Sequence, residues 1–247
     1  KIYIIKQYLT IKEGGDLADI AAEFERRGFF TKEEFFAITG YPGAVWTEES
    51  HLQGPKDFSN EFALLRDKPP RISLEGYLFP DTYQITRNET PEGFVRRALK
   101  NFESHLTLDI VETIKAQGKT VFEVVNFASL LEKEVRTLED KKLVAGVLQK
   151  RMENDMRLQV DATIVYIREG NYSKVSVEET QIESPYNTYQ VYGLPLGPIA
   201  NPGLESIYAA LEPKENPYWF YLSAPDGTTI FSKNFEEHKA AKQLYLR

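Results

Sequence analysis

The most informative pattern of hydrophobic and polar positions lies in residues 121–138. A rotation of about 100° per residue places five apolar side chains within about 40° of one line, which predicts the core-facing stripe of a helix. Glu132 and Glu134 fall about 80° to opposite sides of this stripe. The stripe consists of Val124, Ala128, Leu131, Val135 and Leu138.

Both carboxylates therefore lie at the shoulders of an apolar face. Partial desolvation there would raise a carboxyl pKa toward the value that a general acid needs. The alternative is that both are solvated residues at the edge of the helix, near Lys133 or Arg136. Helical geometry alone treats Glu132 and Glu134 equally.

Apolar periods, helix caps and turn residues predict further helices and strands along the chain. Asp16 is a good N-cap for one helix, and Thr31 with Glu34 forms a capping box for the next. Ala224-Pro-Asp-Gly227 between two apolar runs predicts a β-hairpin. The expected elements are one or two strands in 2–11, helices at 17–27, 32–38, 60–65 (short), 91–105, 108–117 and 138–152, a hairpin from 219–223 and 228–231, and a helix at 235–246.

Helices and hairpins are segregated along the chain rather than alternating, which favours an α+β fold. The one shift in composition is near Pro69-Pro70. We therefore expect a small β-α-α module at 1–70 with its connection, and a mixed α+β domain at 71–247.

Three polar or aromatic stretches lack a clear period. The aromatic residues 74–83 suit either a packed connection or a groove wall carrying Glu75, Tyr77, Asp81 and Tyr83. Gln159 and Asp161 share a side if 157–161 is extended, whereas Asp161 could instead cap a helix through Ile167. Residues 184–203, rich in Pro and Gly, suit a surface loop or a backbone that binds a polar ligand.

Composition narrows the class of protein. The 247 residues are 42% hydrophobic and 27% charged, as in soluble globular proteins, and the net charge of −7 argues against a nucleic-acid partner. Cysteine is absent and the three histidines are scattered, so we expect no thiolate chemistry, no metal site and no cofactor. No apolar run is long enough to span a membrane. The chain begins at Lys1, so we expect a removed signal or anchor before it.

Five ordered motifs together resemble the MltG/YceG family of endolytic murein transglycosylases. The resemblance covers nearly the whole chain, and residues 13–21 resemble the LysM-like module of that family. Phe235-Glu-Glu-His238 also fits. The motifs are Leu74-Glu-Gly-Tyr-Leu-Phe-Pro-Asp-Thr-Tyr83, Ala128-Ser-Leu-Leu-Glu-Lys-Glu134, Arg157-Leu-Gln-Val-Asp161, Ser184-Pro-Tyr-Asn-Thr-Tyr189 and Gly193-Leu-Pro-Leu-Gly-Pro-Ile-Ala-Asn-Pro-Gly203.

The resemblance implies a bacterial enzyme that cleaves the β-1,4 bond between N-acetylmuramic acid and N-acetylglucosamine within nascent peptidoglycan. Its products carry 1,6-anhydro ends, and cleavage would limit the length of glycan strands. The family is usually held by one N-terminal membrane helix, here expected before Lys1, with its catalytic domain outside the cytoplasmic membrane. Glycan strands are the expected partner, and cell-wall synthesis proteins are further candidates.

The resemblance also implies roles for single residues. The second glutamate of Glu-Lys-Glu, Glu134, is the expected general acid and base, with Glu132 as the alternative; Val135 stands where the family carries a hydroxyl residue. One carboxyl suffices because it protonates the glycosidic oxygen and then accepts the proton of the C6 hydroxyl. Residues expected to bind substrate are Glu75, Tyr77, Gln159, Asp161, Tyr186, Asn187 and Tyr189.

Two rival functions remain open from the sequence. The first is a module that binds peptidoglycan without cleaving it. The second is a hydrolase that uses Glu134 with a second carboxylate, Asp161 or Glu75, as ordinary glycosidases do.

Overall fold

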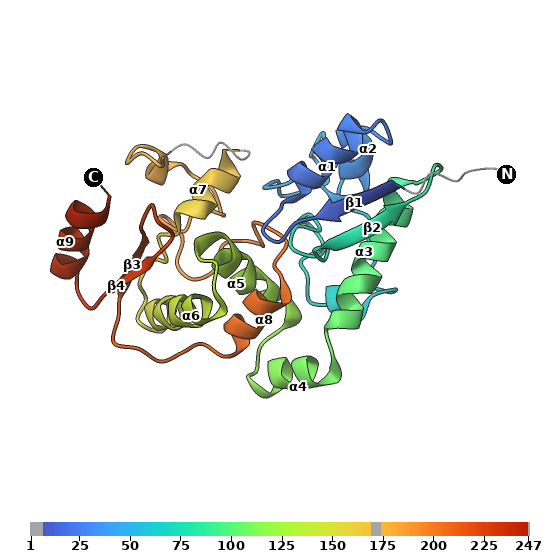
Figure 1. Ribbon diagram of the computed structural model, residues 1–247. Helices are drawn as coiled ribbons and strands as arrows, with labels where there is room; N and C mark the ends of the chain where they lie inside the picture. Colours follow the sequence, from blue (N-terminus) through green and yellow to red (C-terminus); the bar gives the residue numbers. More distant parts are fainter. Residues whose placement is uncertain (1–6, 169–173, 247) are drawn as a thin grey trace. The chain divides into compact units, whose positions relative to one another are not determined.

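The computed structural model describes residues 7–168 and 174–246 (Figure 1). The chain divides into two compact units. The first comprises residues up to Ser129 together with Gly197–Leu204, and the second comprises Leu130–Leu196 and the residues from Glu205 on. Helices and two small antiparallel sheets make up both units, so the expected α+β class is confirmed.

The first unit is built on a two-stranded sheet that helices cover on one face. The sheet pairs β1 with β2, with Leu9 opposite Tyr83, and buries alternate residues of each strand. The elements are β1 (Gln7–Ile11), α1 (Leu17–Arg26), α2 (Lys32–Thr39), η1 (Ala63–Leu65), β2 (Asp81–Ile85), α3 (Pro91–His105), α4 (Leu108–Ala116) and the first part of α5 (Val121–Glu134).

Caps and apolar stripes account for these helices. Asp16 and Asp19 form a capping box at α1, and Thr31 with Glu34 forms the expected one at α2. Phe24 of α1 lies at the centre of the core, where its ring is 4.2 Å from Phe30 and 4.6 Å from Phe94 between centroids. Offset and edge-to-face contacts of this kind add stability beyond burial alone.

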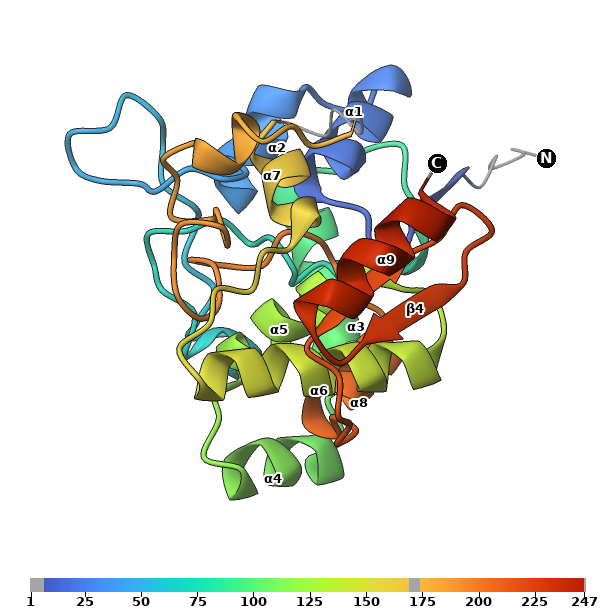
Figure 2. The ribbon, with the colours of Figure 1, turned by 90° about the vertical axis from the view of Figure 1, so that its left-hand side faces the viewer.

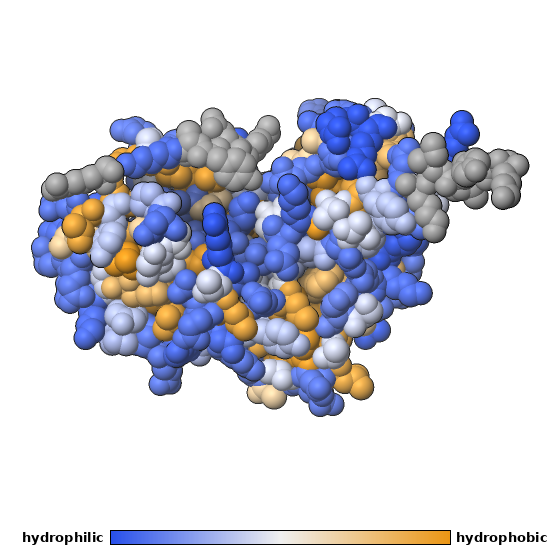
Figure 3. Space-filling model, viewed as in Figure 1, coloured by the Kyte–Doolittle hydropathy of each residue, from blue (hydrophilic) through white to orange (hydrophobic). Residues whose placement is uncertain are grey.

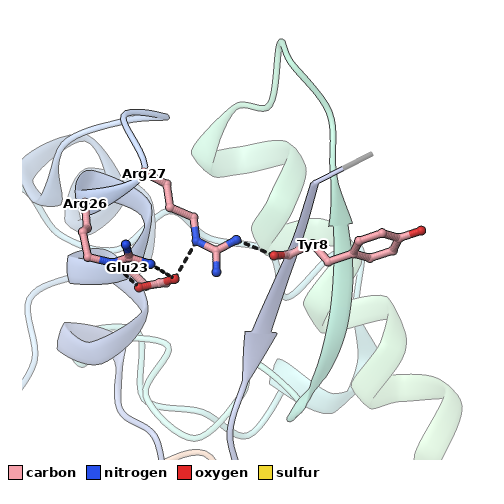
Figure 4. Close-up of polar contacts among 4 residues, drawn as sticks. All are labelled: Tyr8, Glu23, Arg26 and Arg27. Carbon is pink, nitrogen blue, oxygen red and sulfur yellow. Dashed lines mark hydrogen bonds and ion pairs between the residues drawn. The ribbon is translucent and has the colours of Figure 1, made fainter. Parts of the chain in front are cut away.

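An arginine joins the end of α1 to the sheet (Figure 4). Arg27 donates to Glu23, with 2.5 Å between Nε and Oε1, and also to the backbone carbonyl of Tyr8 in β1. Arg26 bonds the same carboxylate at 2.7 Å. These two hydrogen-bonded guanidinium groups, Arg26 first, lower the pKa of Glu23 to about 2.

The boundary expected near residue 70 does not coincide with the division between the compact units. Strand β1 pairs with β2 across that point, so the residues on its two sides share one sheet and one core. The composition shift marks an irregular connection inside the first unit instead. The likeness of the N-terminal residues to a LysM-like module stays a prediction.

The second unit contains the hairpin and the helices around it. Strands β3 and β4 are antiparallel, with Tyr221 opposite Phe231, as the turn at 224–227 predicts. The elements are the end of α5, α6 (Leu138–Glu153), α7 (Asp161–Ile167), η2 (Glu179–Gln181), α8 (Leu204–Leu211), β3 (Phe220–Ser223), β4 (Thr229–Ser232) and α9 (Phe235–Tyr245). Of the two possibilities for 157–167, the helix forms, with Asp161 as its first residue rather than its cap.

The Pro- and Gly-rich residues 197–203 are a buried part of the first unit rather than a surface loop. The Asn201 side chain accepts the backbone N–H of Leu78 and donates to the carbonyl of Gly15, both at 2.9 Å. This stretch is therefore structural.

Hydrophilic residues dominate the visible surface, and hydrophobic ones appear as small scattered patches (Figure 3). In the part of the chain that the structure describes, no helix has the length and apolar character to cross a bilayer.

Candidate active site

Glu134 is the last residue of α5, and its side chain is half-buried. The C-terminal end of a helix carries the negative end of the helix dipole, which disfavours a carboxylate. The backbone carbonyl of Glu134 accepts a hydrogen bond from Ser223 Oγ at 3.3 Å, so the β3 strand holds this helix end in place. The position of Glu134 thus favours its protonated form.

The Glu134 carboxyl group is hydrogen-bonded to the hydroxyl of Tyr221 in β3. Burial raises the pKa of Glu134 to about 7, and the negative charge of Asp161 acts in the same direction. The Tyr221 hydrogen bond and the positive charge of Arg151 oppose this rise. Glu134 can therefore hold or release a proton near neutral pH.

Arg151 of α6 ties together the segments around Glu134. Its buried guanidinium donates to the carbonyl of Trp219 from Nε at 2.9 Å and from Nη2 at 2.7 Å, and to the carbonyl of Leu158 from Nη1 at 2.7 Å. Trp219 lies two residues before Tyr221, and Leu158 directly precedes Gln159. One arginine therefore fixes two segments that carry pocket residues.

These side chains line a pocket of about 640 Å³ in the second unit. Gln159 lies at its wall with φ of 52°, a left-handed conformation that is uncommon outside glycine, and its N–H donates to the carbonyl of Thr188 at 3.1 Å. Asp161 accepts a hydrogen bond from the hydroxyl of Tyr189. The pocket thus combines a protonatable carboxyl, a hydrogen-bonded carboxylate and an exposed amide.

A second hollow of about 390 Å³ adjoins the same carboxyl. Lys133, Glu134 and Ser223 line both hollows, and the hairpin turn at 225–227 and Arg136 are among the further residues that line the second. A ligand longer than one unit could therefore extend to both sides of Glu134.

The arrangement suits acid–base chemistry on a polar, extended ligand. The model of the YceG-like family matches residues 3–244, nearly the whole chain. The chain belongs to the YceG-like family. This confirms the resemblance seen in the motifs.

Known YceG-like relatives are similar over most of this chain. A Bacillus subtilis protein named endolytic murein transglycosylase is 32% identical over 96% of this chain, and a Streptococcus pneumoniae protein of the same name is 36% identical over 93%. The chain spans only 65% and 43% of the length of these relatives. The 2.6 Å crystal structure of a YceG-like protein from Listeria monocytogenes matches with a TM-score of 0.79 and 29% identity, covering 95% of this chain and 76% of that one.

Four of the residues expected at the site line the pocket of this YceG-like chain: Glu134, Gln159, Asp161 and Tyr189. Tyr186 and Asn187 are buried beside it instead. The Asn187 amide donates to the carbonyls of Thr180 and Ile182 at 3.1 and 2.7 Å, and its oxygen accepts the N–H of Tyr189 at 2.9 Å. Asn187 therefore holds the loop that presents Tyr189.

Glu132 has different surroundings from Glu134. Its carboxylate forms an ion pair with the buried Lys141, with 3.1 Å between Nζ and Oε1, and accepts the hydroxyl of Ser206 at 2.7 Å. The Glu132 side chain is only 8% exposed, and it contributes to the smaller hollow but not to the larger one. A carboxylate neutralised in this way holds α5 to α6 and α8.

Glu75 and Tyr77 do not lie at the pocket, so the expectation that they form a groove wall is wrong for this structure. Both are in the core of the first unit, at 1% and 0% exposure. The two Glu75 oxygens accept the N–H of Leu17 at 3.1 and 3.2 Å, at the positive end of the α1 dipole. Glu75 therefore stabilises the start of α1 and does not contact a ligand in the pocket.

Several residues that line the pocket were not expected from the sequence. Tyr221 lies in a strand that was expected only as part of a hairpin. Arg151 is four residues after Val147 on the apolar side of α6, and a charged residue in that position could have marked a buried contact. The C-terminal helix and its cap add Phe235, His238, Lys242 and Leu246.

Proposed function

We propose that this chain is the catalytic part of an endolytic peptidoglycan lytic transglycosylase. It would cleave the β-1,4 bond between N-acetylmuramic acid and N-acetylglucosamine inside glycan strands and leave 1,6-anhydro ends. The names of the relatives support this activity. We expect the protein to be held at the membrane, to act outside the cytoplasmic membrane and to limit strand length.

One observation carries the proposal: a half-buried carboxyl with a pKa of about 7 opens on a pocket large enough for sugar units. A general acid works best when its pKa lies near the working pH. Glu132 instead forms a buried ion pair with Lys141 and does not line the larger pocket. Glu134 is therefore our candidate for the acid and base.

The reaction needs one group that first gives and then takes a proton. Glu134 donates its proton to the glycosidic oxygen as the bond from that oxygen to C1 of the muramic residue breaks. The C6 hydroxyl oxygen then bonds to C1, and the Glu134 carboxylate accepts its proton. No water is consumed, and Glu134 ends protonated as it began. Asp161, Gln159 and Tyr189 would orient the sugar and stabilise the positive charge that develops at C1.

A second candidate function arises from Asp161, which lines the same pocket as Glu134. Ordinary glycosidases use two carboxyl groups that flank the glycosidic bond. In that case water, and not the C6 hydroxyl, would attack C1. The other carboxylate considered from the sequence, Glu75, is buried elsewhere and cannot serve.

The test is a digest of purified peptidoglycan with the unaltered protein and with Glu134→Gln, read by mass spectrometry. We expect internal fragments with anhydro ends from the unaltered protein and none from the variant. Glu112→Gln is the matched control because Glu112 is an exposed residue of α4 that loses the same charge.

Any other outcome of this digest would assign a different catalytic residue or a different function. Products that carry an added water would replace the transglycosylase with the hydrolase. Anhydro products that persist in Glu134→Gln would move the catalytic role to Glu132. Glycan binding without any cleavage by the unaltered protein would leave a binding module.

A further inference from the structure

One face of α9 lines the pocket beside Glu134. Phe235, His238, Lys242 and Leu246 succeed one another at intervals of three, four and four residues, so they lie along one side of the helix. Figure 2 shows α9 lying along the hairpin strand β4. The C-terminal helix therefore supplies a wall of the site that Glu134 occupies.

The charge that this face of α9 presents to the pocket is positive. The acidic side chains of α9 are engaged elsewhere: Glu236 pairs with Lys239 at 2.8 Å, and Glu237 accepts the N–H of Lys233 at 2.8 Å. Lys242 is exposed, and within the described residues no carboxylate lies within 4.0 Å of its ammonium group. The protein has a net charge of −7, yet this ammonium group on the pocket wall has no carboxylate beside it within the described residues. It is therefore available to bind an anion.

The wall also carries an exposed aromatic ring. Phe235 is 55% exposed although it lines the pocket, and its ring packs on that of Phe220 at 5.9 Å between centroids. His238 is buried and stacks on the same Phe220 ring at 5.2 Å. A rigid aromatic surface beside a cation suits a sugar ring whose apolar face packs on Phe235 while an acidic substituent reaches the cation.

We propose that the Phe235–Lys242 face of α9 is a subsite for an acidic sugar unit, with Lys242 binding a carboxylate of that unit. The inference rests on the proposed function, in which the strand contains muramic residues. Their carboxylate is either that of the lactyl ether or one on an attached peptide. Lys242 then distinguishes peptidoglycan from neutral β-1,4 glycans.

The test measures binding with Glu134→Gln protein, so that no cleavage is needed. Lys242→Glu is compared with Lys233→Glu, which makes the same charge change at an exposed lysine that does not line the pocket. Lys239 is not used as the control because its ammonium group lies over the Phe235 ring, 5.2 Å from the centroid. The ligands are peptide-free glycan strands, peptide-bearing strands and neutral chito-oligosaccharides. Both lysines are exposed, so neither change should disturb folding.

We expect Lys242→Glu to weaken binding of the acidic strands by about tenfold or more, the factor for a lost hydrogen bond to a charged group. Lys233→Glu should have little effect, and neither change should alter binding of chito-oligosaccharides. Weakening with peptide-free strands assigns the lactyl carboxylate; weakening only with peptide-bearing strands assigns a peptide carboxylate.

Equal effects of the two charge reversals would overturn the subsite. So would equal weakening for neutral and acidic ligands. Failure of the proposed function is a separate result, because it would be seen as absence of cleavage by the unaltered protein whatever the binding pattern.

Discussion

The hydroxyl of Tyr221, on the hairpin, donates a hydrogen bond to the carboxyl of Glu134, at the end of α5. The two residues are far apart in the sequence. The hydrogen bond stabilises the carboxylate form and so opposes the burial that raises the pKa of Glu134.

Tyr221→Phe should therefore raise the pKa of Glu134 above its value of about 7. If the protonated group starts the reaction, activity falls as pH rises through this pKa, so the descending limb of kcat/KM should move to higher pH in the variant. We also expect kcat to fall by about tenfold, because a hydrogen bond to a charged group is lost when the proton has been donated.

The measurement is the rate of release of anhydro products between pH 5 and pH 9 (roughly the span over which a group of this pKa titrates). Tyr218→Phe, before the same strand and off the pocket, is the control. An unchanged pH profile in Tyr221→Phe would show that this hydroxyl does not act on the group that titrates.

Glu134→Gln should stabilise the protein at neutral pH. The pKa of Glu134 rises from 4.5 to about 7 on folding, so between these values the folded chain binds more protons than the unfolded chain, and stability falls as pH rises through this window. Glutamine cannot ionise and escapes this loss. We expect a gain of about 1–3.5 kcal/mol above pH 7, the upper figure being the whole pKa change from 4.5 to about 7 at about 1.4 kcal/mol per pKa unit.

Denaturant unfolding at pH 4 and pH 8 would measure this gain. The two proteins should be similar in free energy of unfolding at the lower pH and should differ at the higher one. Equal stability at both would mean that Glu134 is solvated enough to ionise without cost.

Lys141→Met should be strongly destabilising, because it leaves the Glu132 carboxylate buried without its ion partner. Breaking one side of such a pair costs about 3–5 kcal/mol. The neighbouring Lys142 forms a partly exposed ion pair with Glu212 at 2.6 Å, and Lys142→Met should cost no more than about 1 kcal/mol.

Thermal unfolding of both variants gives the comparison. Adding Glu132→Gln to Lys141→Met should recover part of the loss, since the uncompensated charge is then removed. A double variant as unstable as Lys141→Met would contradict the assignment of Glu132 as a structural ion partner.

His238 should stay neutral down to about pH 5, since burial, with the positive charges of Lys242 and Arg151, lowers its pKa to about 4. The groups that face it are Lys242 on its own helix, Arg151 from α6 and the ring of Phe220. An NMR titration of the imidazole would measure this. Lys242→Ala should raise the pKa of His238, and an unchanged value would mean that the Lys242 charge points away from the ring.

Much of the local structure could be predicted from the sequence. The capping residues Asp16 and Thr31, the apolar stripe of α5 and the hairpin turn at 224–227 all act through residues within a few positions of one another. Such patterns depend on helix and strand periods, which are properties of the local chain. The ordered motifs likewise identified the family, and by themselves they favoured Glu134 over Glu132.

Only the tertiary structure decided which polar groups meet. It separated two glutamates of one helix by their partners, Lys141 for Glu132 and Tyr221 for Glu134. It also buried Glu75 against the start of α1 and brought α9 to the pocket. The physical reason is that desolvation and charge pairing depend on neighbours that are distant in sequence, and no periodic pattern records which distant residues these are.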